Sequence, residues 1–462
     1  MGMHIFYDLE TTGTDIVYDQ ILQFGAILAD DSLIELDRFE IRCRLLPWIV
    51  PSPVALFVTA TDVDLLDDPS LPDFYAMMHE ISERLARWGR ATFIGYNSMR
   101  FDEPFLQRAF WQALFPPYLT VTGGNTRLDL LPLVRAAAWA RPDFFNIPHR
   151  EDGAPTFRLD ALAPANGFNA HRAHDAMGDV EATLFLARKV AARFPELWKP
   201  LVARASKASS AELLDSGAPV FLFHHGDTPP MACYYRIDKG GGRQSHAILA
   251  RLGYDWAGVG VPSPENSTSM RSALRRIPLN KAPLFLTLAE AKAIAGLMPS
   301  DSEYAQAGFL AGDADYCVRL AELIEPFAKP ETADGAQVEE TIFDGFASLD
   351  DERLMKEFHQ APPHDQLIIA RRFGDSRFRR LAMRFLFVRA PQVLSPREQE
   401  QIRLGIARRL DGDATGRHPS RSIPDAIAEL ESNPELAPTV EAQRIMAWLA
   451  NRTLLSRSKT TG

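Results

Sequence analysis

The sequence predicts an α/β domain, a small β-rich domain and a helical domain, in that order. Residues 1–195 alternate apolar runs with amphipathic stretches, as strands and helices do in an α/β domain. Residues 202–330 hold short strand-like runs between glycine and proline clusters, a pattern typical of a small barrel. In residues 338–455, strand signals fade and arginine-rich amphipathic helices dominate. We therefore expect three domains, with the polar stretch 328–337 as the linker before the third.

Apolar runs and turn residues delimit the elements of these domains. Thr11–Gly13 and Asp30–Asp31 favour turns after the first two strands. Pro104 fits the first turn of a helix, where a missing N–H breaks no hydrogen bond. In the first domain we expect strands at residues 3–7, 21–28, 35–43 and 91–96, and helices at residues 74–88, 102–115 and 175–194. In the second domain we expect strands at residues 220–223, 232–237 and 246–252, and a helix at residues 288–297.

The composition is that of a folded protein. The chain of 462 residues is 46% hydrophobic and 24% charged, which excludes disorder as its main state. It has neither a long uninterrupted apolar stretch nor the charged segment and apolar run of a secretory signal. Cys43, Cys233 and Cys317 are far apart and odd in number, which suits a reducing compartment and excludes a thiolate zinc site. We expect a cytoplasmic protein with three buried thiols.

The formal net charge of -10 is unevenly distributed. Residues 1–195 hold 17 basic and 26 acidic side chains, whereas residues 345–462 hold 19 and 15. This balance argues against a surface covered with nucleic-acid-binding charge, because such binding needs clustered lysine and arginine. The same balance is compatible with a local cluster of basic residues toward the C-terminus.

Two carboxylates lie at the end of the first predicted strand. Asp8 and Glu10 are two residues apart, so both side chains face the same side of the sheet. Two like charges so close repel each other unless a cation lies between them. Taken alone, a D-x-E pair at a strand end is more often a solvated turn than a metal site.

A second acidic motif, GYNSMRFD at residues 95–102, joins a buried strand to a helix. Taken alone, Asp102 is interpreted as a helix N-cap and Asn97 as a turn former. A functional interpretation requires that Asp102 meets the carboxylates of the first motif.

The third motif is HDAMGD at residues 174–179. Asp175 can cap the long helix, and Asp179 then lies one turn inside it. A lone histidine at a helix entry usually has a structural role, but His174 and Asp179 can face one point. If Asp8, Glu10 and Asp102 lie at that same point, a functional site is favoured over a structural role for the histidine.

The ordered set D-x-E, N-x-x-x-F-D and H-x-x-x-x-D resembles the DEDD exonuclease superfamily, in its histidine-containing branch. Residues 95–111, 125–136, 155–167 and 173–183 are similar to the bacterial exonuclease I family, and weaker similarity continues at residues 278–283 and 342–346. The first motif departs from this family. It reads DLETTG, where exonuclease I typically has aromatic residues at the middle and fifth positions. The middle domain also shows little similarity at the level of motifs.

This resemblance implies a ribonuclease-H-like first domain, with a mixed central sheet flanked by helices. It also implies an SH3-like middle domain and a C-terminal helical domain that together wrap single-stranded DNA. The implied activity is metal-dependent 3′-to-5′ hydrolysis of single-stranded DNA to nucleoside 5′-monophosphates, in DNA repair and recombination. Two Mg²⁺ ions, with Mn²⁺ as a substitute, would generate hydroxide and stabilise the leaving oxygen.

The resemblance also assigns roles to individual residues. His174 is the expected general base, because its ordinary pKa lies near neutral pH. The expected metal ligands are Asp8, Glu10, Asp102 and Asp179. The expected substrate-binding residues are Thr11, Thr12, Gly13, Asn97 and Arg158. For Arg158 an exposed salt bridge is the alternative, and Asp129 is expected to be a structural carboxylate.

The expected partners are single-stranded DNA with a free 3′ end and the acidic tail of single-stranded DNA-binding protein, and we expect a monomer. One alternative is an RNA-directed or proofreading exonuclease of the same superfamily, although such relatives are usually smaller. The other is a catalytically inactive nucleic-acid-binding scaffold, against which the intact set of acidic residues counts.

The strongest basic segment is residues 371–389, in which seven arginines alternate with phenylalanines. Arginine and aromatic residues together are typical of a single-strand groove in which bases stack. The alternative is an amphipathic helix with core phenylalanines and solvated arginines.

Overall fold

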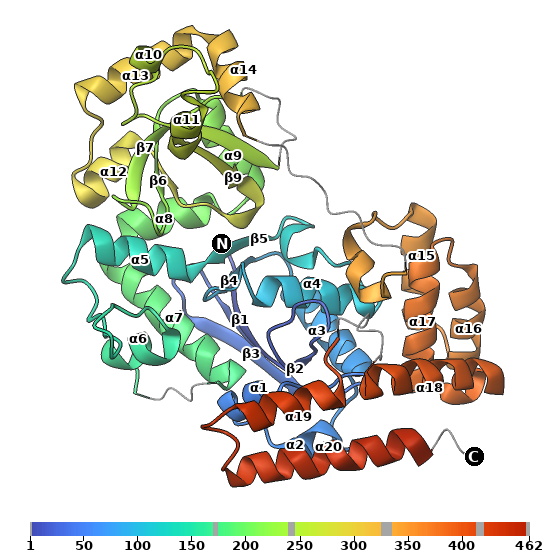
Figure 1. The fold of residues 1–462 in the computed structure, drawn as a ribbon. Coiled ribbons are helices and arrows are strands. Elements are labelled where there is room, and N and C mark those ends of the chain that lie inside the picture. The colour runs from blue at the N-terminus through green and yellow to red at the C-terminus, as the bar shows by residue number, and fades with distance from the viewer. Residues whose placement is uncertain (1, 170–173, 239–244, 325–334, 413–419, 459–462) are drawn as a thin grey trace.

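A computed structural model describes residues 2–169, 174–238, 245–324, 335–412 and 420–458. The chain forms three groups of elements (Figure 1). The first, blue to teal, occupies the centre, and the second, green to yellow, lies on one side of it. The third, orange to red, lies against the opposite side and continues beneath the first.

The first group is built on a mixed five-stranded sheet with the strand order β3-β2-β1-β4-β5. The central strand β1 pairs antiparallel with β2 and parallel with β4. The strands are β1 (His4–Thr11), β2 (Ile21–Ala29), β3 (Glu35–Arg42), β4 (Thr92–Gly95) and β5 (Thr126–Asp129). The predicted α/β class is confirmed. β5 escaped the sequence analysis because its four residues, TRLD, include two charges.

Helices cover both faces of this sheet. On one face, Tyr7 and Leu9 of β1 pack in a core that includes residues of α3 and α4. On the other face, Phe6 packs in a core shared with α5 and α7. Because side chains alternate along a strand, Asp8 and Glu10 lie on the same face of the sheet as Phe6, which is the face that α7 covers. The helices are α1 (Pro53–Val58), α2 (Val63–Leu66), α3 (Phe74–Trp88), α4 (Asp102–Gln112), α5 (Leu130–Ala140), α6 (Leu159–Ala165) and α7 (Ala176–Arg193).

The second group contains an antiparallel five-stranded sheet with the order β10-β6-β7-β8-β9. Its strands are β6 (Val220–Phe223), β7 (Met231–Arg236), β8 (His246–Arg251), β9 (Leu274–Pro278) and β10 (Phe285–Leu286). The surrounding helices are α8 (Pro195–Ala203), α9 (Lys207–Asp215), α10 (Trp256–Val259), α11 (Ser267–Ala273), α12 (Leu288–Ala295), α13 (Asp301–Gly312) and α14 (Ala314–Glu322).

A buried arginine joins the first group to the second. Arg127 of β5 forms a buried ion pair with Glu103 of α4, with an N–O distance of 2.5 Å. The same guanidinium donates to the backbone carbonyl of Asn280 from Nε at 3.1 Å and from Nη2 at 2.6 Å. Tyr7 of β1 also donates to Glu103, at 3.0 Å. The segment before β10 is thereby anchored to the edge strand of the first sheet.

The third group is helical and comprises α15 (Leu349–Gln360), α16 (Pro363–Arg372), α17 (Ser376–Arg389), α18 (Pro396–Asp411), α19 (Ile423–Ser432) and α20 (Val440–Ser458). Helices α19 and α20 pack on α1, and α20 also reaches α2 (Figure 1). Arg444 of α20 pairs with Asp62 at 2.6 Å and Asp64 at 2.9 Å.

The phenylalanines of residues 371–389 belong to the core of this third group. Phe373, Phe378 and Phe385 are buried. Arg384 pairs with the buried Glu339 at 2.8 Å, and Arg389 pairs with Asp73 at 2.9 Å. The hypothesis that these phenylalanines are stacking platforms for bases is therefore wrong, and the amphipathic-helix alternative explains them.

Three further expectations concern the whole chain. Cys43, Cys233 and Cys317 are buried free thiols, as predicted. Among the described residues, no helix combines the length and the apolar character needed to cross a membrane. The expected linker at residues 328–337 lies mostly outside the described residues.

Candidate active site

Three carboxylates meet where β1 approaches α7. Asp8 and Glu10 lie on β1, and Asp179 lies in the first turn of α7. One oxygen from each of the three carboxylates lies within 4.8 Å of the others. The predicted same-face arrangement of Asp8 and Glu10 is confirmed, and Asp179 joins them from the helix above.

A glycine allows α7 to approach the sheet this closely. Gly25 of β2 pairs with Asp8 of β1. A Cβ at residue 25 would lie 2.9 Å from both the carbonyl carbon of Ala176 and the nitrogen of Met177. The first turn of α7 therefore rests directly on the backbone of β2, and this contact carries Asp179 toward β1.

Polar side chains fix the start of the same helix. Gln23, which pairs with Glu10 across the sheet, donates to Asp175 at 2.7 Å and accepts from the N–H of Ala176 at 3.3 Å. Arg42 of β3 also donates to Asp175, at 2.8 Å. Asp175 is the N-cap residue, but its carboxylate bonds these side chains instead of the helix backbone.

The loop between β4 and α4 brings Asp102 to the site. Asn97 has a φ of 62°, in the left-handed region. The Asp129 carboxylate accepts from the N–H groups of Asn97 at 2.8 Å and Met99 at 3.2 Å, which fixes the loop. Asp129 is thus structural, as expected. Asp102 is the first residue of α4 and Phe101 occupies the N-cap position, so the N-cap alternative is wrong.

The acidic cluster lines a pocket of about 570 Å³. His174, with a φ of 61°, borders this pocket and also a neighbouring cleft of about 1060 Å³ between the first and second groups. Asp102 and Phe101 line the pocket from the loop before α4. The pocket wall also includes Leu9, Thr11, Gly13, Ser52, Val54, Ala55, Val58, Arg421 and Glu429.

Burial and mutual repulsion disfavour ionisation of the carboxylates. Burial, followed by the charges of Asp102, Asp179 and Glu10, raises the pKa of Asp8 well above its ordinary value. Burial and the charges of Asp179 and Asp102 raise the pKa of Glu10 to about 8. Burial is also the main reason that the pKa of Asp102 rises to about 8. A divalent cation bound among these groups would remove the repulsion.

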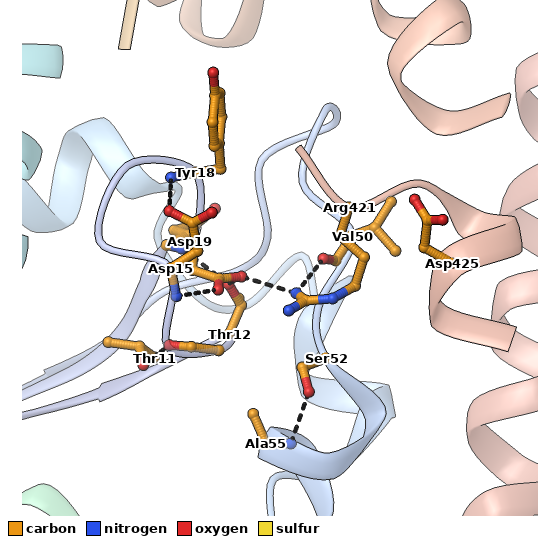
Figure 2. Close-up of polar contacts among 12 residues, drawn as sticks. Thr11, Thr12, Asp15, Tyr18, Asp19, Val50, Ser52, Ala55, Arg421 and Asp425 are labelled. Carbon is orange, nitrogen blue, oxygen red and sulfur yellow. Dashed lines mark hydrogen bonds and ion pairs between the residues drawn. The ribbon is translucent and has the colours of Figure 1, made fainter. Parts of the chain in front are cut away.

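The residues expected to bind substrate differ in their surroundings. Thr11 and Gly13 line the pocket. Thr12 is fully buried, and its hydroxyl donates to Asp19 at 2.8 Å (Figure 2). Asn97 borders both the pocket and the cleft, whereas Arg158 lines only the cleft. Arg158 also pairs with Asp160 at 2.7 Å, which is the exposed salt bridge considered from the sequence.

Several residues that build the site were not found from the sequence. Gly25 and Gln23 lie inside a strand whose apolar pattern gives no sign of which helix packs on it. Arg421 and Glu429 are far from the acidic motifs along the chain, and they reach the pocket only because α19 packs on α1.

Family models match two parts of the chain. Residues 5–186 match the model described as "Exonuclease", and residues 336–451 match the one described as "Exonuclease I C-terminal domain". The fold and the acidic pocket thus belong to the class of exonuclease-domain proteins. The two matches, in this order on one chain, support a relationship to bacterial exonuclease I.

Known proteins resemble the chain in sequence and in fold. Exodeoxyribonuclease I of Haemophilus influenzae is 32% identical over 47% of this chain and 46% of the relative. The Escherichia coli enzyme is 33% identical over 46% of this chain and 44% of its own length. The alignments therefore span about half the length of these curated relatives.

Solved structures match over nearly the whole chain. The structure of E. coli exonuclease I with a dA16 oligonucleotide has a TM-score of 0.80 at 22% identity, covering 99% of this chain and all of the other. Exonuclease I from Methylocaldum szegediense gives 0.76 at 24% identity with the same coverage. The zinc-bound form of an E. coli exonuclease I complex with single-stranded DNA gives 0.78 at 22%. These likenesses show that the fold is shared over all three groups of elements.

Replacing Gly25 with alanine tests the close approach of α7. The added Cβ would push α7 away from β2, and we expect a loss of about 1–3 kcal/mol in stability. Because Asp179 moves with the helix, Mn²⁺ should also bind more weakly, as isothermal titration calorimetry would measure. Gly253→Ala is the control, because a Cβ there meets no atom within 4 Å. Equal Mn²⁺ affinity in the two variants would contradict this account.

The raised pKa values predict how stability depends on pH without divalent cations. Glu10 ionises near its ordinary pKa in the unfolded chain but only near pH 8 in the folded protein, so the folded state binds more protons between these values. The free energy of unfolding should therefore fall as the pH rises through this interval. Thermal denaturation in EDTA from pH 5 to pH 9 would measure the decline, which Glu10→Gln should make shallower. An unchanged slope in this variant would show that Glu10 does not contribute.

Proposed function

We propose that the protein is a metal-dependent 3′-to-5′ exonuclease that hydrolyses single-stranded DNA to nucleoside 5′-monophosphates. The observation that carries this proposal is the cluster of Asp8, Glu10 and Asp179 in a pocket that adjoins a basic cleft. The exodeoxyribonuclease I relatives and the E. coli exonuclease I structures with oligonucleotides support the same activity. A role in DNA repair and recombination follows from this activity.

The donor atoms of the cluster fit hard divalent cations. Carboxylate oxygens are the ligands that Mg²⁺ and Mn²⁺ prefer, and the cluster offers only oxygens. Asp8, Glu10 and Asp179 would hold the metal, with Asp102 as the fourth carboxylate of the pocket. When two Mg²⁺ ions are bound, they supply hydroxide near neutral pH and stabilise the leaving oxygen.

The remaining chemistry belongs to the side chains around the cluster. His174 lines the pocket and accepts the proton of the attacking water, for which a neutral imidazole is suited. Thr11 and Gly13 contact the terminal nucleotide, while Asn97 holds a phosphate where the pocket meets the cleft. The apolar wall of Val54, Val58 and Phe101 accommodates a base or sugar.

The cleft next to the pocket provides a path for the rest of the strand. Its lining combines basic side chains, which attract phosphates, with a partly exposed aromatic ring, Phe157, on which a base can stack. The basic residues are Arg100, Arg135, Arg150, Arg158, Arg276 and Lys281. This surface, between the first and second groups, replaces residues 371–389 as the proposed single-strand groove.

The partners and location follow from the same proposal. The substrate is single-stranded DNA with a free 3′ end, and the acidic tail of single-stranded DNA-binding protein is a further partner. The protein acts as a monomer in the cytoplasm, where its three free thiols remain reduced.

One assay separates the possible substrates. The purified protein with Mg²⁺ should shorten 5′-labelled single-stranded DNA stepwise and release nucleoside 5′-monophosphates, as gel electrophoresis and chromatography would show. Duplex DNA and RNA of the same sequence should be degraded more slowly. If no substrate is shortened, the protein is not a nuclease. If RNA is cleaved equally well or faster, the RNA-directed alternative holds instead.

Substitution of Asp179 separates catalysis from binding. Asp179→Ala removes one of the three clustered ligands, so cleavage should fall below detection. DNA binding in Ca²⁺, measured by gel shift, should persist, because the basic cleft is intact. The control is Glu181→Ala on the same helix, where Glu181 pairs with Arg38 at 2.9 Å. Retained cleavage by Asp179→Ala would remove Asp179 from the ligand set.

A further inference from the structure

The loop that follows the acidic strand is organised around one buried carboxylate. The side chain of Asp19 is 4% exposed. Its Oδ1 accepts from the hydroxyl of Thr12 at 2.8 Å, and its Oδ2 accepts from the N–H of Asp15 at 2.9 Å (Figure 2). A Cβ on Gly13 would lie 2.3 Å from Oδ2, so the carboxylate also packs against the backbone of Gly13. Asp19 thus sets the shape of the segment that begins directly after Glu10.

An arginine from the helical C-terminal group neutralises this carboxylate. Arg421, just before α19, donates from Nη1 to Asp19 Oδ1 at 3.1 Å and to the carbonyl of Val50 at 3.3 Å (Figure 2). Burial raises the pKa of Asp19, and the charge of Arg421 is the largest influence in the opposite direction. Without Arg421 the buried carboxylate would lack this positive charge, and the loop bonds that it accepts would weaken.

The same arginine is connected to a second wall of the pocket. Arg421 Nε pairs with Glu429 of α19 at 3.3 Å. Glu429 accepts the hydroxyl of Ser52, whose backbone N–H donates to the carbonyl of Thr12 at 2.7 Å. Ser52 is the N-cap of α1, and its hydroxyl accepts from the N–H of Ala55 at 3.1 Å. Arg421 therefore joins two segments, one at Thr11–Gly13 and one at Ser52, and both line the pocket that contains the carboxylates.

We propose that Arg421 is a positioning residue for the nuclease reaction, which fixes the Thr11–Gly13 backbone against the metal-binding carboxylates through Asp19. This inference rests on the proposed nuclease function. Arg421 acts through Asp19 and Val50, and the reacting phosphate needs no contact with it. Docking of the helical C-terminal group on the exonuclease domain thereby completes the pocket as well as extending the protein's surface.

The test compares two arginines that join the same two parts of the chain. Arg421→Ala should lower the rate constant of single-turnover cleavage of single-stranded DNA about 10- to 100-fold, because small displacements in an active site cost this much. Arg444→Ala, the matched control, removes ion pairs to Asp62 and Asp64 and should leave the rate constant within about twofold, since α2 does not line the pocket. Affinity for the same DNA in Ca²⁺ should stay unchanged in both variants.

Two further variants distinguish positioning from a general loss of structure. Arg421→Lys keeps a donor for Asp19 and should recover part of the rate, and it serves as the test variant if Arg421→Ala does not fold. The double variant Asp19→Ala/Arg421→Ala should be no slower than Asp19→Ala alone, because the two side chains act as one unit.

Three results would overturn the inference in an active wild-type protein. The first is an Arg421→Ala rate within twofold of wild type, and the second is equal slowing by Arg444→Ala. The third is multiplicative slowing in the double variant. Wild-type protein that cleaves no substrate would instead overturn the proposed function.

Discussion

Repulsion among carboxylates gathered at the end of β1 is the constraint on which the rest of the site depends. Asp8, Glu10, Asp102 and Asp179 come from a strand and two helices, and burial with mutual repulsion raises the pKa values of Asp8, Glu10 and Asp102 above their ordinary values. Such an arrangement persists only if its supports are rigid. The close packing of α7 on Gly25 provides one support from the sheet. The Asp129 carboxylate, which accepts from two backbone N–H groups, fixes the loop that leads to Asp102.

The three groups of elements contribute unequal parts to this site. The first supplies the clustered carboxylates and His174, so the acidic part of the pocket comes from one domain. The second supplies one side of a basic cleft, and Arg127 contributes to its attachment, because the guanidinium is shared between Glu103 and the carbonyl of Asn280. The third supplies part of the pocket wall through residues next to and within α19. Domains that extend a binding surface also determine the shape of the pocket that they border.

The sequence was sufficient to predict structure where the outcome depends on residues close together along the chain. The alternation of side chains along a strand placed Asp8 and Glu10 on one face, and periodicity identified α3 from its first residue to its last. It was insufficient where tertiary packing decides. β5 was missed because Arg127 is a buried charge that breaks the apolar pattern, and the burial of Thr12 depends on a carboxylate seven residues away. Phenylalanines of α17 have the same spacing whether they bind bases or fill a core, and only burial distinguishes the two.

The contact between Arg421 and Asp19 spans 402 positions of the chain. Long-range contacts of this kind close the largest loops and form after local structure in most folding reactions. During synthesis, which proceeds from the N-terminus, the acidic strand emerges long before the arginine that braces the loop beside it. One wall of the pocket is consequently among the last parts of the molecule to be completed, and a nascent chain carries the carboxylates before it carries the finished cavity around them.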